Sequence, residues 1–102
     1  MIDRWKAAEK EICRLLRKKH VGGPGQPDCS GGGEVVEVKA QRHRVNQWQM
    51  REILSKPWAR GIPLIIASTS GFTPGAKELA AERSNVWLYK VYPGRGSRRL
   101  SA

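Results

Sequence analysis

Acidic residues are scarce in this chain, which has nine Asp and Glu against nineteen Lys and Arg. The formal net charge is +10 over 102 residues. A charge excess of this size destabilises a compact chain by self-repulsion unless a polyanion binds it, and nucleic acid is the commonest polyanion. The composition therefore predicts a nucleic-acid partner.

Long apolar runs are also missing. No uninterrupted apolar stretch exceeds that of residues 64–67, and a membrane span needs roughly 20 apolar residues. The first turn is charged and no apolar run follows it, so we expect neither a signal peptide nor a membrane partner. The two cysteines, Cys13 and Cys29, fit no zinc spacing and no disulfide framework, which favours a reducing cytoplasm.

The length allows one hydrophobic core and therefore one domain. We expect this domain to occupy residues 1–92. Residues 93–102 (PGRGSRRLSA) are basic and lack apolar periodicity, which predicts a flexible C-terminal tail.

The periodicity of apolar residues predicts helices and strands in the order α-β-β-α-β-α-β. The expected helices are 3–19, with Asp3 as N-cap, 46–55 and 73–83, and the expected strands begin at 28, 34, 63 and 86. This order predicts an α/β fold in which a mixed central β-sheet is flanked by helices on both faces. Residues 63–68 are wholly apolar, which is typical of a central strand covered on both faces.

One acidic residue falls where a carboxylate is unfavourable. Helical projection of residues 3–19 places Glu9 between Trp5, Ile12 and Leu16 on the apolar face. An ionised carboxylate facing a core costs several kcal/mol or so unless it is paired. Glu9 is thus either a site residue, or a side chain that reaches the rim or pairs with a lysine.

The β-rich run 34–40 carries the second unusual pattern. Its period of two places Glu37 and Lys39 on one face and Val36 and Val38 on the other. An acid and a lysine so placed can position a divalent metal and a water beside a phosphate, and Asp28 begins the partner strand of the expected hairpin. The alternative is an ordinary cross-strand salt bridge between Asp28 and Lys39.

These motifs resemble a nuclease family. Pro-Asp at 27–28, Glu-Val-Lys at 37–39 and the upstream Glu9 are similar to the PD-(D/E)xK signature of restriction-endonuclease-like nucleases. Within that family the chain resembles archaeal-type Holliday junction resolvases over about residues 4–92, through AAEKEICRLL at 7–16 and ARGIPLIIA at 59–67.

The resemblance implies a restriction-endonuclease-like fold and a homodimer that resolves four-way DNA junctions by paired nicks in recombination and repair. It implies that Glu9, Asp28 and Glu37 are metal-site and catalytic residues and that Lys39 is catalytic. The implied cofactor is Mg²⁺, with Mn²⁺ as a substitute. The expected location is the cytoplasm of a prokaryotic cell, or the host cytoplasm if a virus encodes the protein.

Two alternatives remain open. The segment SGFTPGAKELA at 70–80 also resembles modification-dependent restriction enzymes, so the chain is alternatively a restriction-type or replication-associated nuclease on duplex DNA. The other alternative is a non-catalytic nucleic-acid-binding module with a structural acid cluster. Three carboxylates near phosphates favour an enzyme over a pure binder, because negative charge there weakens binding.

Further residues are assigned to surfaces. The expected DNA contacts are Lys6, Lys10, Arg42, His43 and Arg44. The expected dimer interface is on the second helix, at Trp48, Met50, Ile53 and Leu54. Aromatic residues and Met are enriched at interface centres, but these side chains alternatively cover the sheet.

Overall fold

A computed structural model of the chain describes residues 4–100. Its helices are α1 (Arg4–Leu15), α2 (Gln47–Leu54), α3 (Pro74–Ala81) and the short 3₁₀ helix η1 (Pro57–Ala59). Its strands are β1 (Lys19–His20), β2 (Cys29–Gly31), β3 (Glu34–Lys39), β4 (Leu64–Ser68), β5 (Val86–Tyr92) and β6 (Gly96–Arg99). The predicted N-cap Asp3 lies outside the described residues.

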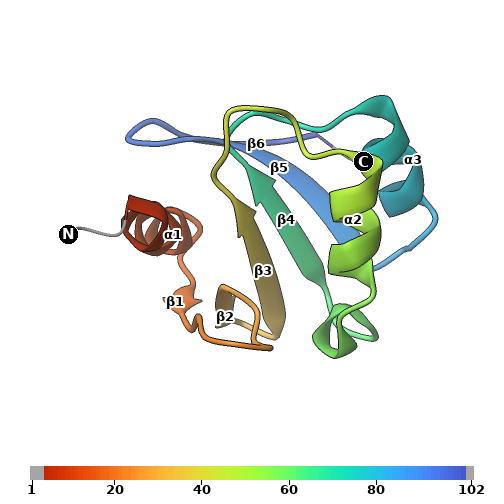
Figure 1. The fold of residues 1–102 in the computed structure, drawn as a ribbon. Coiled ribbons are helices and arrows are strands. Elements are labelled where there is room, and N and C mark those ends of the chain that lie inside the picture. The colour runs from red at the N-terminus through yellow and green to blue at the C-terminus, as the bar shows by residue number, and fades with distance from the viewer. Residues whose placement is uncertain (1–3, 101–102) are drawn as a thin grey trace.

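The strands form one mixed sheet in the order β1-β2-β3-β4-β5-β6 (Figure 1). The segment from β1 to β3 is antiparallel, β3, β4 and β5 are parallel, and β6 returns antiparallel to β5. The predicted α/β class and mixed sheet are confirmed. The predicted element order is incomplete, because β1 and β6 are additional strands.

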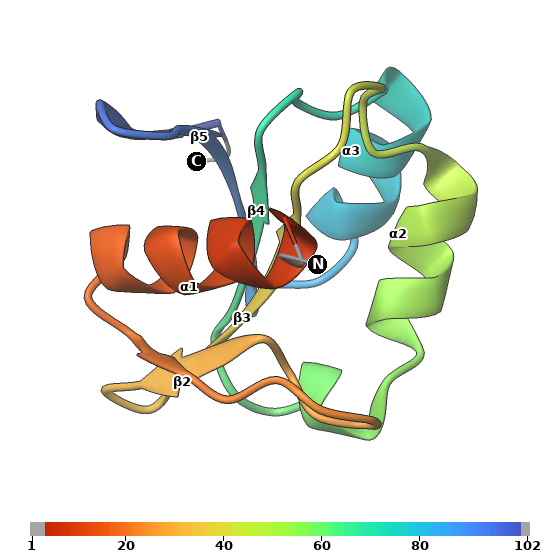
Figure 2. The ribbon, with the colours of Figure 1, turned by 60° about the vertical axis from the view of Figure 1, so that its left-hand side comes forward.

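The helices cover both faces of the sheet, as predicted. Figure 2 shows α1 on one face and α2 with α3 on the other. Ile12 of α1 packs with Val36 and Val38 of β3, whereas Val35 of the same strand packs with residues of α2 and α3. All of β4 is buried, which confirms it as the central strand. No helix within residues 4–100 is long and apolar enough to cross a membrane.

The ends of the helices follow their sequence signals with one exception. Asn46 caps α2 through a reciprocal capping box with Gln49, and Thr73 caps α3. Helix α1 ends at Leu15 instead of continuing to residue 19. Arg17 adopts a left-handed conformation at φ 59°, and the Lys18 N–H donates to the Cys13 carbonyl, which closes the helix.

The predicted flexible tail is wrong for Gly96–Arg99, which forms β6. Tyr92 accepts a hydrogen bond from the backbone N–H of Arg95 at 2.8 Å, and Gly94 between them has φ 76°. Pro93 followed by a left-handed Gly94 is the pattern of a type II turn. This turn reverses the chain and allows β6 to pair along β5.

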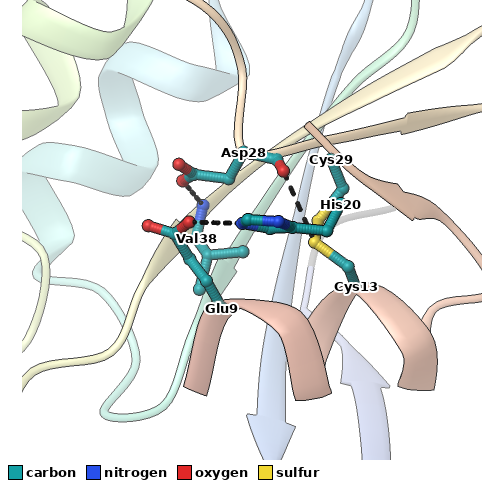
Figure 3. Close-up of a disulfide and its surroundings, with 6 residues drawn as sticks. All are labelled: Glu9, Cys13, His20, Asp28, Cys29 and Val38. Atoms are coloured by element: carbon teal, nitrogen blue, oxygen red, sulfur yellow. Dashed lines mark hydrogen bonds and ion pairs between the residues drawn. A yellow bond between two sulfur atoms is a disulfide. The ribbon is translucent and has the colours of Figure 1, made fainter. Parts of the chain in front are cut away.

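The expectation that the two cysteines fit no disulfide framework is also wrong. Cys13 of α1 and Cys29 of β2 form a disulfide, with their Cα atoms 5.6 Å apart (Figure 3). Both residues are buried. Only the packing of α1 against the β2–β3 hairpin brings them together, since they are 16 positions apart in the chain.

The expected dimer interface on α2 needs a correction. Met50, Ile53 and Leu54 are 0%, 2% and 5% exposed, because they cover the sheet and form the core between α2 and α3. Only Trp48 of the four lies at the surface, at 64% exposure. The alternative that these side chains cover the sheet holds for the other three.

This division of α2 predicts opposite effects for two substitutions. We expect Met50→Ala to lower the free energy of unfolding by about 2–5 kcal/mol, because it leaves a cavity in the core. Trp48→Ala removes only an exposed ring that contacts Arg51, which we expect to cost at most about 1 kcal/mol. Urea denaturation of both variants measures the difference, and equal losses would contradict the assignment.

Candidate active site

The site lies at the end of β3 that extends beyond its pairing with β2. Strand β2 pairs with β3 only as far as Cys29 opposite Val36, but β3 continues to Lys39. Beyond that point the Asp28 side chain takes the place of a strand. The backbone N–H of Asp28 donates to the Val36 carbonyl at 3.0 Å, and the Asp28 carboxylate accepts from the Val38 N–H at 2.7 Å. Asp28 is therefore fixed against the open edge of β3.

Glu37 and Lys39 share one face of β3, as the period of two predicts. They lie on the side of Val35, opposite Val36 and Val38. Lys39 Nζ lies 3.7 Å from Glu37 Oε2, and their side chains are 30% and 13% exposed. The carboxylate is thus nearly enclosed, while the ammonium group reaches solvent.

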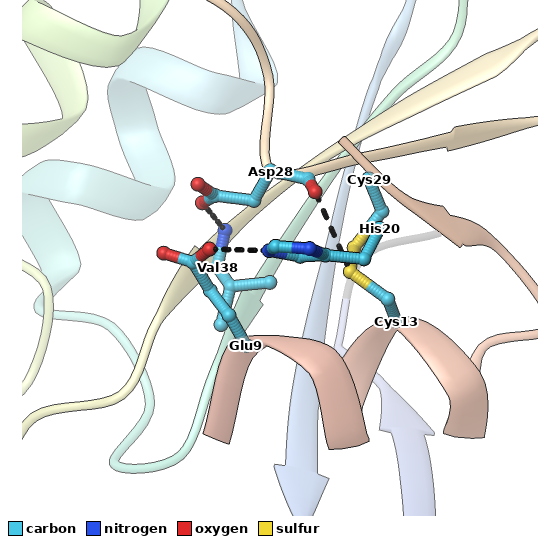
Figure 4. Close-up of polar contacts among 6 residues, drawn as sticks. All are labelled: Glu9, Cys13, His20, Asp28, Cys29 and Val38. Atoms are coloured by element: carbon cyan, nitrogen blue, oxygen red, sulfur yellow. Dashed lines mark hydrogen bonds and ion pairs between the residues drawn. A yellow bond between two sulfur atoms is a disulfide. The ribbon is translucent and has the colours of Figure 1, made fainter. Parts of the chain in front are cut away.

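Glu9 approaches the same region from α1. Its Oε2 lies 3.0 Å from Nε2 of His20 in β1, and both side chains are about one quarter exposed (Figure 4). The expected alternative was a lysine partner, but the structure supplies a histidine. No local pattern predicts this contact, because β1 has only two residues and His20 lies 11 positions from Glu9.

The pKa values show that the three carboxylates lie within electrostatic reach of one another. Burial, and then the neighbouring Asp28 carboxylate, raise the pKa of Glu37 to about 8, against an opposing effect of Lys39. Burial raises the pKa of Glu9, the hydrogen bond to His20 opposes this, and Asp28 raises it further. Negative charge at this point is therefore only partly compensated.

The chemistry of these donors fits a hard divalent cation, although they do not form a preassembled cage. Within residues 4–100, no group of three or more His, Cys, Asp or Glu side chains is arranged to hold a metal. Mg²⁺ needs only one or two protein carboxylates, because it retains waters and binds substrate oxygens. Asp28 and Glu37 meet that requirement. A cation would relieve the Asp28 repulsion, which adds to the effect of burial in raising the pKa of Glu37.

A pocket adjoins these residues. It has a volume of about 230 Å³ and is lined by Glu9, Val38, Lys39, Ala40 and Gln41. A larger cavity of about 410 Å³ lies elsewhere, between α3 and β5, and contains none of the predicted site residues. The smaller pocket is the relevant one, because both Glu9 and Lys39 line it.

The sequence did not single out the polar residues that support this pocket. Gln41 and Gln49 exchange two side-chain hydrogen bonds, at 3.0 and 2.8 Å, which tie the end of β3 to α2. Thr69, after β4, accepts from the Gln41 N–H and donates to its carbonyl. The sequence signal for Gln49 is the Asn46–Gln49 capping-box pattern, which predicts a helix start but not the contact with Gln41. No local pattern marks Gln41.

The expected DNA-contacting residues lie at the surface. Lys6 and Lys10 are exposed on α1, and Arg42, His43 and Arg44 are exposed on the loop that leaves the pocket. This loop is held in place, since the His43 carbonyl accepts from Ser70 Oγ at 2.6 Å. The structure thus places a cationic loop directly after Lys39 and Gln41.

Comparison of the chain with protein-family models, curated proteins and solved structures finds no match. The functional assignment therefore depends on the chemistry of the site.

The raised pKa of Glu37 predicts a pH dependence of stability. The folded state keeps Glu37 protonated up to about pH 8, whereas the unfolded chain releases that proton near 4.5. Since the native state binds more protons in this window, the free energy of unfolding falls as pH rises through it. We expect Glu37→Gln to remove this loss and to be more stable than wild type above pH 8, by roughly 1–3 kcal/mol.

Urea denaturation in metal-free buffer at about pH 5 and about pH 9 tests this expectation. The stability difference between the two proteins should be small at the acidic pH and large at the alkaline one. A difference that does not change with pH would contradict the burial of an uncompensated carboxylate at Glu37. Glu11→Gln, an exposed acid on α1, is the matched control.

Proposed function

We propose that this protein is a Mg²⁺-dependent, structure-selective DNA endonuclease that resolves four-way junctions by paired nicks. The observation that carries the proposal is the convergence of Glu9, Asp28 and Glu37 beside Lys39, in a chain with a net charge of +10. Carboxylates are few in this chain, and these three lie within electrostatic reach of one another. The α/β sheet and the likeness to the PD-(D/E)xK signature support a restriction-endonuclease-like fold.

Asp28 and Glu37 would hold the metal ion, and Glu9 would add a third carboxylate at the rim of the site. When bound, a divalent ion polarises a phosphoryl oxygen and lowers the pKa of a coordinated water. Mn²⁺ prefers the same oxygen ligands and is expected to substitute. The Asp28 side chain remains fixed by the Val38 N–H, which orients its second oxygen.

Lys39 has the position of a charge-stabilising group. Lys39 lines the pocket and its side chain is 30% exposed, so a phosphate of the DNA backbone can approach it. There it would orient the attacking water or neutralise negative charge that develops on the phosphorus oxygens. Its nitrogen lies 3.7 Å from Glu37 Oε2, so the lysine and the carboxyl group face the same part of the site.

The cations near the pocket fit a DNA backbone as a partner. Arg42, His43 and Arg44 follow β3, which carries Glu37 and Lys39. Lys6 and Lys10 lie on α1, which carries Glu9. Phosphate contacts position a duplex without reading its sequence, which suits recognition of DNA shape. The proposed location, the cytoplasm of a prokaryotic cell or of an infected host, rests on the DNA substrate alone. The Cys13–Cys29 disulfide removes the argument that the cysteines favour a reducing compartment.

A symmetric homodimer is part of the proposal. One chain contributes one such site, and paired nicks on opposing strands need two sites in one complex. A C₂ dimer is the commonest way for a small domain to present two copies of a site. Of the four residues expected at the interface, Trp48 remains available for this contact, because Met50, Ile53 and Leu54 are buried.

The central prediction concerns cleavage. We expect Asp28→Asn, Glu37→Gln and Lys39→Ala each to cut a labelled four-way junction at least ~10²-fold more slowly in Mg²⁺. The two carboxylate variants should bind the junction as well as or better than wild type, since they remove negative charge near phosphate. Single-turnover cleavage and gel-shift titration measure both properties.

Glu11→Gln and Lys77→Ala are the matched controls, because both residues are exposed and lie away from the pocket. Near wild-type cleavage by any of the three site variants would refute the assigned role of that residue. Faster cutting of a matched linear duplex than of the junction would instead favour a restriction-type or replication-associated nuclease. Binding without cleavage, in Mg²⁺ and in Mn²⁺, would leave a nucleic-acid-binding module.

The dimer has its own test. Light scattering at low micromolar concentration should give twice the mass of one chain for wild type, and the mass of one chain for Trp48→Glu. The second measurement is the fraction of junctions cut on both strands within one binding event, which should fall in Trp48→Glu. A wild-type monomer that still makes paired nicks would refute the dimer.

A further inference from the structure

The disulfide joins the two segments that supply Glu9 and Asp28 (Figure 3). Cys13 follows Glu9 by one turn on α1, so both side chains lie on the same face of that helix. Cys29 directly follows Asp28 at the start of β2. Each half of the covalent bond is therefore anchored next to one carboxylate of the site.

We propose that the Cys13–Cys29 disulfide is a redox clamp that holds Glu9 at the site. Oxidation fixes α1 on the β2–β3 hairpin, and reduction by a dithiol releases it. The effect on cleavage rests on the proposed nuclease function, whereas the effect on the position of α1 rests only on the geometry. The two cysteines are positioning residues, since neither would touch the substrate.

The reduced chain can retain its fold, but the distance between α1 and β2 must change. Cys13 Sγ lies 3.6 Å from the Asp28 carbonyl oxygen, so a Cys13 thiol has an acceptor in place. Ile12 still packs on the sheet, and Lys18 still pairs with Glu34. However, two unbonded sulfur atoms lie roughly 1–2 Å further apart than bonded ones. Reduction therefore moves the face of α1 that carries both Cys13 and Glu9 away from β2.

A shift of that size matters at this site. The Glu9 carboxylate contacts His20 at 3.0 Å and also raises the pKa of Glu37, so it lies close to both partners. A misplacement of about 1 Å in a catalytic site can lower the rate by a factor of about 10². We therefore expect reduction to lower Mg²⁺-dependent cleavage by at least about tenfold.

The redox step is an ordinary thiol–disulfide exchange with a dithiol reductant. A thiolate of the reductant attacks one sulfur of the pair, the second sulfur leaves as a thiolate, and a mixed disulfide forms. The second thiol of the reductant then resolves it. The reductant loses two electrons and becomes a disulfide, while Cys13 and Cys29 gain two electrons and two protons. Because Cys13 is 1% exposed and Cys29 0%, attack requires α1 to open first.

The experiment compares the full chain before and after treatment with dithiothreitol, with thiol content checked by a thiol-reactive dye. Amide hydrogen exchange in α1 should be at least tenfold faster after reduction, while exchange in α3, on the opposite face, should be unchanged. The NMR signals of the His20 ring, which contacts Glu9, should shift. The Mg²⁺ dependence of junction cleavage should move to higher concentration, without a change in junction affinity.

Three variants provide controls. The double variant Cys13→Ala with Cys29→Ala should behave like the reduced protein and should not respond to dithiothreitol. The double variant with Ser at both positions is the second choice if the first does not fold. Glu9→Gln should lose the dependence of cleavage on the redox state, because the group that the clamp positions has been neutralised.

The outcomes separate this inference from the proposed function. Equal exchange in α1 and an unshifted His20 ring in the two redox states would overturn the clamp, whatever the activity. Faster exchange in α1 with unchanged cleavage would overturn it as well. Faster exchange in α1 and a shifted ring, with no cleavage in either state, would support the clamp and refute the nuclease.

Discussion

The unpaired edge of β3 is the constraint on which the rest of the structure depends. A buried strand must satisfy its backbone groups, and β2 ends its pairing with β3 at Val36. The Asp28 side chain satisfies the Val38 N–H instead of a strand. This substitution brings a carboxylate to the edge where Glu37 and Lys39 emerge, and α1 closes the same region with Glu9. A longer β2 would have covered the edge and excluded the site.

The grouping of acids is unfavourable for folding, which is why it is informative. A nearly enclosed Glu37 next to Asp28 has its pKa raised to about 8, so the folded chain resists ionising it at neutral pH. Ordinary surface electrostatics in a chain with a net charge of +10 would disperse its few acids among the cations. Perturbed carboxylates of this kind are concentrated at functional sites, where substrate or metal supplies the missing charge.

Helix α1 forms a separate layer, whose core residues belong to a different cluster from those of α2 and α3, yet it carries Glu9 of the candidate site. Among residues 4–100 it is the one helix on its face of the sheet, whereas α2 and α3 pack on each other and on the opposite face (Figure 2). Its attachments include the apolar packing of Ile12, the Glu9–His20 contact and the disulfide at Cys13. The Lys18–Glu34 ion pair holds the segment that follows the helix. A covalent bond in such a layer restrains Glu9 more than it restrains the rest of the core.

The α2 helix shows the limit of apolar composition as a guide. Met50 and Trp48 are both large and apolar, yet one is fully buried and the other 64% exposed. Their positions on the helix decide this, because only one face of α2 reaches the sheet. Composition alone therefore favoured an interface where most of the apolar surface belongs to the core.

Local patterns determined most of the secondary structure of this protein. Period two in β3, the wholly apolar β4, the capping residues Asn46 and Thr73 and the Thr-Pro start of α3 each act within a few residues, so the sequence alone predicts them. The same period placed Glu37 and Lys39 on one face. The turn at Pro93 and Gly94 was also a local signal, and reading it would have predicted β6.

Tertiary packing decided the rest. The Cys13–Cys29 bond, the His20–Glu9 contact and the Gln41–Gln49 pair join segments that are 16, 11 and 8 residues apart. In no pair do the two residues share a helix or a strand, so no single helical or strand period relates them, and each contact depends on how α1, the hairpin and α2 lie against the sheet. The residue types of the candidate site were therefore readable from the sequence. Their partners and protonation depend on distances that exist only in the folded chain.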